Sequence, residues 1–143
     1  MWLYYALGAS TFWGITYVFN EQAYKKISVL TSLALASFVV FAITTILSLS
    51  SGNFVEDIKQ IASSRQLLGY VAGGIISLLI AELFIGYSIT AKSATLAGLI
   101  EISYPIFIAL FSYLFFKSKV NLPTLIGAAV VFTGIFIIYR FNK

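Results

Sequence analysis

The sequence predicts a single all-α domain, a polytopic membrane protein with five transmembrane helices that takes in all 143 residues. Three observations predict this fold class. Hydrophobic residues make up 60% of the chain and charged residues only 10%, whereas soluble domains average roughly 25% charged residues. The apolar residues form five stretches, each close to the roughly 20 residues that a helix needs to cross a bilayer. The alternation with a period of two that marks a membrane β-barrel is absent.

No basic leader precedes the first predicted span and no evident cleavage site follows it, so we expect a retained helix rather than a cleaved signal peptide. The five predicted spans cover residues 2–19, 29–49, 67–91, 93–116 and 122–139. The sequence contains no cysteine and no histidine, which excludes disulfides, thiol catalysis and metal sites built on these residues. We expect no cofactor, no metal and no enzymatic activity, because no nucleophile–base pair is present.

The nine basic residues give a net charge of +4. They lie in loops and at span ends, which indicates a role in membrane topology and not in binding nucleic acid. Five spans would place four basic residues on the side of the N-terminus and five on the other side. Cytoplasmic loops normally carry a clear excess of Lys and Arg, so two arrangements remain open. The chain inserts with its N-terminus outside, or it inserts both ways and opposite copies pair as an inverted homodimer.

The first span carries polar and aromatic residues on one helical face, which we expect to contact protein or a cavity rather than lipid. These residues are Ser10, Trp13, Gly14, Tyr17, Asn20 and Glu21. Helix packing and cavity lining remain alternatives for this face, and Glu21 is interpreted as an interface residue. In the polar stretch 50–66, Asn53 is placed to cap a short helix on the membrane surface, with a solvated connector as the alternative.

The remaining spans contain small residues and one proline. In the third span the small residues recur every fourth position, a spacing that favours close packing of membrane helices. They are Gly69, Gly73, Ser77 and Ala81. In the fourth span Gly98 shares a narrow face with Glu101 and Pro105. Proline removes a backbone donor, so the carbonyl of Glu101 loses its helical partner. Gly127 and Gly134 mark the fifth span as a packing or dimerisation helix.

Two acidic residues, Glu82 and Glu101, lie inside apolar spans, where ionisable side chains are rare and by default indicate ion or substrate handling. They are ten and nine residues from Lys92 at the predicted turn, so both lie roughly 15 Å below it, at matching depth. Desolvation and mutual repulsion favour the neutral carboxyl. We therefore expect one or both to be protonated at neutral pH and able to exchange that proton for a cationic substrate. The alternative is that each carboxyl only bonds to a neighbouring helix.

Four short motifs occur in order along the chain: STFWGI at 10–15, ITAKSATLAG at 89–98, YPIFIAL at 104–110 and LIGAAVVFTG at 125–134. Together they resemble one half of an EamA-type protein of the drug/metabolite transporter superfamily. Members usually carry two such halves, inverted, in ten helices. The resemblance implies that this chain is one inverted-repeat unit, which self-associates and exports a small metabolite or drug across the inner membrane of a bacterium or an archaeon.

Two departures from the family pattern bear on the substrate. The family often has Glu directly before the proline of the fourth helix, whereas here Tyr104 is in that place and Glu101 is one turn earlier. The family also often has a basic residue in the second helix, and residues 29–49 contain none. Both departures argue against binding of an anion.

The main hypothesis is a small proton-coupled secondary transporter that acts as a homodimer in the lipid bilayer on a small-molecule substrate, with no nucleic acid as partner. The residues expected to bind protons or substrate are Glu101, Glu82, Trp13, Tyr17 and Tyr104. Those expected to have a structural role are Pro105, Gly14 and Gly98. The alternative is a non-transporting membrane subunit that stabilises a larger complex, for example one that handles lipids.

Overall fold

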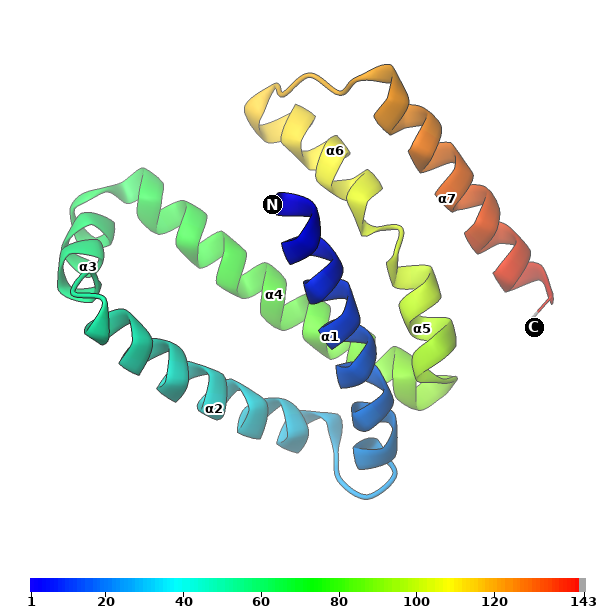
Figure 1. Cartoon of the computed structure of the whole chain (residues 1–143), viewed down its shortest axis with the longest axis horizontal. Helices are drawn as coiled ribbons and strands as arrows, with labels where there is room; N and C mark the ends of the chain where they lie inside the picture. The colour runs from blue at the N-terminus through cyan, green and yellow to red at the C-terminus, as the bar shows by residue number, and fades with distance from the viewer. Residues whose placement is uncertain (142–143) are drawn as a thin grey trace.

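In a computed structural model, residues 1–141 are described and fold into α-helices joined by short loops. The helices are α1 (Trp2–Tyr24), α2 (Val29–Ser50), α3 (Phe54–Ser63), α4 (Arg65–Ala91), α5 (Ala94–Glu101), α6 (Tyr104–Phe116) and α7 (Leu122–Phe141). Figure 1 shows α2 and α4 as a long hairpin joined through α3, with α1 crossing the end of α4 and lying beside α5. The prediction of an all-α fold is confirmed.

Four segments of the described chain are long and apolar enough to cross a membrane: α2, α4, α5 together with α6, and α7. The prediction of a polytopic membrane protein is therefore confirmed. Helix α1 is not among the four, although it has 23 residues. Its many tyrosine, tryptophan, serine and threonine residues lower its hydropathy, so its crossing of the membrane stays a prediction. It also runs five residues past the predicted end at 19, because the polar residues that follow continue the helix.

Short polar side chains begin α2, α4, α5 and α7, where their oxygens accept backbone N–H groups that have no partner within the helix. The N–H groups of Thr31, Leu67, Leu96 and Thr124 donate to Ser28, Ser64, Ser93 and Asn121 at 3.1, 3.2, 3.3 and 3.0 Å. The predicted short helix after Asn53 is present as α3. The predicted cap is wrong, because the side chain of Asn53 makes no capping hydrogen bond and its backbone is helical.

The predicted fourth span 93–116 is broken into two helices, which corrects its description as one continuous helix. The chain leaves the helix at Ile102 and Ser103 and changes direction before α6 (Figure 1). Pro105 lies in the first turn of α6, where a missing N–H costs nothing because that group has no helical partner anyway. The N–H of Ile102 still bonds to the carbonyl of Gly98 at 3.1 Å and closes the end of α5. The proline thus starts a new helix instead of only bending one.

The core of the chain is small and lies where α1, α2, α4 and α5 converge near their ends (Figure 1). The buried side chains there are Tyr17, Val29, Ile89, Ala94 and Ala97. The chain exposes 11335 Å², whereas a compact soluble monomer of this mass exposes about 7,300 Å². Most of its apolar surface is therefore left for lipid or for another protein to cover.

Two glycines lie where helices touch, and several others lie on open faces. A Cβ atom added to Gly98 would come within 3.2 Å of the Tyr17 ring, and one added to Gly86 would overlap with Cγ1 of Val29. By contrast, a Cβ atom added to a glycine of the predicted packing faces would meet no atom within 4 Å. Those glycines are Gly69, Gly73, Gly127 and Gly134. The close packing expected at these faces is not made within the described chain.

Candidate functional site

The centre of the candidate site is a hydrogen bond between α1 and α5. The hydroxyl of Tyr17 donates to the carboxyl group of Glu101, the last residue of α5. The Tyr17 side chain is buried, and its ring lies on Gly98, one turn before Glu101. The absence of a side chain at Gly98 lets the ring approach α5 closely enough for its hydroxyl to reach Glu101. Tyr17, Gly98 and Glu101, all predicted site or structural residues, therefore form one contact.

Glu82 lies on α4, partly buried, in the same region of the molecule. Its carboxyl is close enough to Glu101, Tyr17 and Tyr24 to interact with them electrostatically. The two acids that sequence spacing placed at the same depth therefore lie within electrostatic range of each other. No Lys or Arg occurs between Gln66 and Ala91 or between Ala94 and Phe116, so neither acid has a basic neighbour on its own span.

Two further aromatic side chains lie near Tyr17. The ring of Trp13 lies 5.8 Å from that of Tyr17, centroid to centroid, at an interplanar angle of 57°. Tyr104, at the start of α6, is 55% exposed and close enough to Tyr17 for an electrostatic interaction. Gly14, which the sequence assigns a structural role, has no side chain or other helix within 4 Å of an added Cβ. Its face of α1 is therefore open beside Trp13.

The break in the fourth span places two helix ends next to the site. Glu101 ends α5, where the unpaired carbonyls carry partial negative charge, and Tyr104 begins α6, where the N–H groups carry partial positive charge. Pro105 has no N–H to offer the carbonyl of Glu101. Interrupted membrane helices of this kind form ion and substrate sites in transporters. The unpaired backbone carbonyls at the end of α5 and the side-chain carboxyl group of Glu101 therefore lie next to each other.

Glu21 also belongs to this region, through a hydrogen bond to α5 that the sequence did not predict. Its carboxylate accepts a hydrogen bond of 2.9 Å from the backbone N–H of Ala94, the first residue of α5. The sequence did contain a signal, because Glu21 follows Tyr17 by four residues and so lies on the same face of α1. What the sequence did not contain was the partner, which is 73 residues away.

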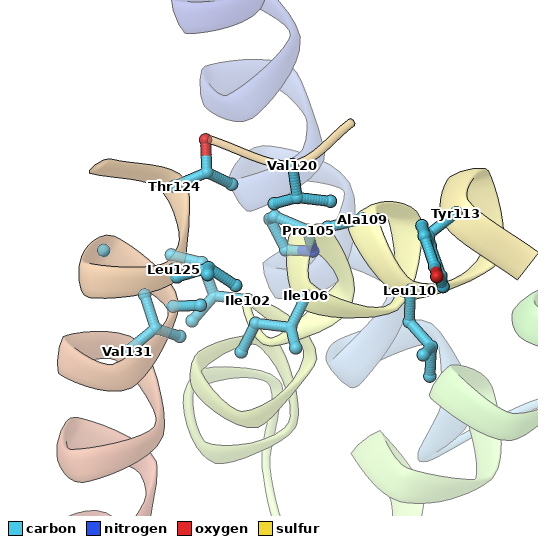
Figure 2. A pocket seen from close by; sticks show the side chains of 12 residues that line it. Ile102, Pro105, Ile106, Ala109, Leu110, Tyr113, Val120, Thr124, Leu125 and Val131 are labelled. Carbon is cyan, nitrogen blue, oxygen red and sulfur yellow. The ribbon is translucent and has the colours of Figure 1, made fainter. Parts of the chain in front are cut away.

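A second feature, separate from the acids, is an apolar groove of about 480 Å³ between α6 and α7. Figure 2 shows Pro105 and Ile106 on one side of the groove and Leu125 and Val131 on the other. Thr124 and the ring of Tyr113 also line it, and no charged side chain does. Pro105 therefore faces this groove, while Glu101 faces α1. Within residues 1–141, no group of three or more His, Cys, Asp and Glu side chains is arranged to hold a metal ion.

Comparison with known protein families gives a match over residues 1–140 to the EamA-like transporter family. The resemblance carried by the four sequence motifs is thereby confirmed. No curated protein and no solved structure matches the chain.

Proposed function

We propose, because the chain belongs to the EamA-like transporter family, that it moves a small metabolite or drug-like molecule across the membrane in exchange for protons. Family membership makes it a membrane transporter of the drug/metabolite type and gives no reason to expect an enzyme. The proton coupling, the cationic character of the substrate and the dimer described below are our proposals. They rest on the surroundings of Glu101.

The observation that carries the proposal is the Tyr17–Glu101 hydrogen bond at the break between α5 and α6. A carboxyl group in this position can accept the Tyr17 hydroxyl in either protonation state. In its neutral form the carboxyl group carries the exchangeable proton. When a cation arrives, the proton leaves to water and the carboxylate faces the cation. When the cation leaves, a proton returns, so that the negative charge of the carboxylate is always neutralised by either the proton or the cation.

The chemistry of the site favours a cation over an anion. Glu82 and Glu101 both contribute negative charge on deprotonation, and neither span contains a basic residue near them. Trp13, Tyr17 and Tyr104 add aromatic faces, which attract cations. An anion would meet two acids without a compensating positive charge. We therefore expect a substrate with an amine, a quaternary ammonium or a similar cationic group.

We further propose that two copies of the chain assemble around the site, and that α1 also crosses the membrane, so that each copy has five spans. The open glycine faces on α4 and α7 and the groove between α6 and α7 leave surfaces that a second copy would cover. The near balance of basic residues across the membrane supports inverted pairing, as in transporters built from inverted repeats. The inner membrane of a bacterium or an archaeon is the proposed location.

Sidedness tests the inverted dimer directly. A reporter fused to either terminus of the intact chain should be found on both sides of the membrane in the same cells. One uniform orientation would rule out inverted pairing and leave a parallel dimer, a partner of similar size or a monomer as the arrangements to examine.

Ligand-dependent thermal stability tests the proposed substrate class. A panel of organic cations, zwitterions and anions is added to the purified chain in detergent, because a ligand that binds only the folded state raises its melting temperature with concentration. We expect at least one cation to stabilise the wild type and not Glu101→Gln or Glu82→Gln. Glu56→Gln, which neutralises an exposed acid on α3, is the matched control and should respond as the wild type does.

The same panel separates the proposal from its rival. Stabilisation by anions alone, or an equal response from Glu101→Gln and the wild type, would contradict a cation site at Glu101. A chain that responds to no compound but purifies with a stoichiometric protein partner would instead favour the non-transporting subunit.

A further inference from the structure

We propose that Glu21 is a positioning residue, which fixes α5 against α1 and thereby holds the carboxyl group of Glu101 at Tyr17. The inference goes beyond the proposed function by assigning a role to a third acid, and it rests on that function only in taking Glu101 as the working group. The observation that carries it is the 2.9 Å hydrogen bond from the Ala94 N–H to the Glu21 carboxylate.

The geometry of α5 shows why this contact matters. Helix α5 has eight residues and is about 12 Å long. It is held on α1 at both ends, at Ala94 by Glu21 and at Glu101 by Tyr17. Tyr17 and Glu21 are one turn apart on α1, so the two helices run in opposite directions and share two polar links. Removing one link leaves α5 attached to α1 by polar contact at one end only.

Helix α5 also packs on α4, with Ala94 and Ala97 in the buried core, and the bond to Glu21 adds a polar link at its first residue. At one end it follows a tight turn through Lys92 and Ser93, and at the other it leads into the break at Ile102 and Ser103. The hydroxyl of Ser93 already accepts the N–H of Leu96, so the N–H of Ala94 is bonded from outside the helix. A carboxylate at a helix N-terminus is also favoured by the helix dipole. Glu21 therefore links the start of α5 to a different helix, whereas Ser93 caps it locally.

Substitution by glutamine distinguishes a hydrogen-bond acceptor from a group that exchanges protons. If Glu21 acts as a hydrogen-bond acceptor, the carbonyl oxygen of glutamine can replace it. If Glu21 exchanges protons itself, glutamine cannot replace it. Glu21→Gln should then preserve the placement of α5, and Glu21→Ala should not.

Spin labels measure the placement of α5 without any substrate. The chain has no cysteine, so single cysteines introduced at Phe12 on α1 and Ile100 on α5, both exposed, can be labelled selectively in the full-length protein. We expect one narrow distance distribution for the wild type, for Glu21→Gln and for Ser93→Ala. Glu21→Ala should lose it and give a broad one. Ser93→Ala is the matched control, because it removes a cap from the same helix end and leaves the link to α1.

Infrared difference spectroscopy gives a second readout, at the group that Glu21 is proposed to position. The carboxyl band of Glu101 is assigned by subtracting the spectrum of Glu101→Gln. We expect Glu21→Ala to shift this band and Glu21→Gln to leave it unchanged. If Glu21→Ala does not fold, Glu21→Asp is measured in its place. The side chain of aspartate is one methylene shorter, so its carboxylate is drawn away from the Ala94 N–H, and we expect the Glu101 carboxyl band to shift.

Three results would overturn the inference. The first is a wild-type distance distribution and a wild-type carboxyl band in Glu21→Ala, or in Glu21→Asp where that variant replaces it. The second is a change in Glu21→Gln as large as the change in Glu21→Ala. The third is a change of the same size in Ser93→Ala. None of these results depends on ligand binding. Failure of the proposed function, seen as an unchanged ligand response in Glu101→Gln, would therefore be recognised separately.

Discussion

The hydroxyl of Tyr17 on α1 donates a hydrogen bond to the carboxyl group of Glu101 on α5, joining two residues 84 positions apart in sequence. The contact lies where the fourth predicted span is interrupted, and it connects the polar face of α1 to an acid inside an apolar segment. It is also part of the small buried core, because the Tyr17 ring is among the few buried side chains. The same residue therefore supports the fold and the proposed chemistry.

The first prediction concerns the hydroxyl alone. Tyr17→Phe keeps the ring on Gly98 and removes the donor to Glu101. We expect the free energy of unfolding to fall by about 1 kcal/mol, the usual net value of one hydrogen bond. Unfolding of the purified protein in detergent measures it. Tyr4→Phe, at an exposed position near the start of the same helix, is the control, and an equal loss in both variants would show that the Tyr17–Glu101 bond adds no stability.

The second prediction concerns the approach of Tyr17 to α5. Gly98→Ala would place a Cβ atom 3.2 Å from Cδ2 and 3.5 Å from Cε2 of the Tyr17 ring. The ring is held by its hydroxyl and cannot move freely, so overpacking, which costs about 1–3 kcal/mol, should outweigh the gain of up to about 1 kcal/mol in helix propensity. A lower unfolding free energy is expected.

Gly127→Ala is the control for Gly98→Ala. It has the same chemistry in α7, with no atom within 4 Å of the added group. It should leave stability unchanged or raise it. Matching effects of the two substitutions would show that Gly98 is not needed for close approach.

The third prediction concerns Gly86, where α4 meets the first residue of α2. A Cβ atom there would overlap with Cγ1 of Val29, which is branched and buried. Gly86→Ala should therefore lower the unfolding free energy by more than about 1 kcal/mol. Combining it with Val29→Ala should cost less than the sum of the two single substitutions, because the shorter side chain makes room. Additive effects would show that the two positions do not touch.

The sequence predicted the apolar helices well because their signal is local. The predicted spans 29–49, 67–91 and 122–139 differ from α2, α4 and α7 by one or two residues at an end. The fourth span was predicted as continuous because its composition is apolar throughout, although the proline already marked where it breaks. Helix α1 was harder to assign, because its polar face lowers the hydropathy on which span prediction depends.

The site was predictable in its residue types and not in its contacts. The sequence shows that Glu82 and Glu101 lie inside apolar spans, and it shows that they are at similar distances from Lys92. The direction in which each faces depends on how the helices rotate about their axes, which packing decides. The link between Glu21 and Ala94 depends on two helices far apart in sequence, and the hydrophobic pattern of neither helix contains it.

The proposed transport cycle requires that the Glu101 carboxyl carries the exchanged proton. Uptake of the best-binding cation into proteoliposomes, driven by an imposed pH gradient, tests it most directly, with wild type, Glu101→Gln and Glu56→Gln reconstituted in parallel. We expect the wild type and Glu56→Gln to accumulate the cation and Glu101→Gln to lose the accumulation that the gradient drives. Accumulation by Glu101→Gln at the wild-type level would show that the Glu101 carboxyl does not carry the exchanged proton.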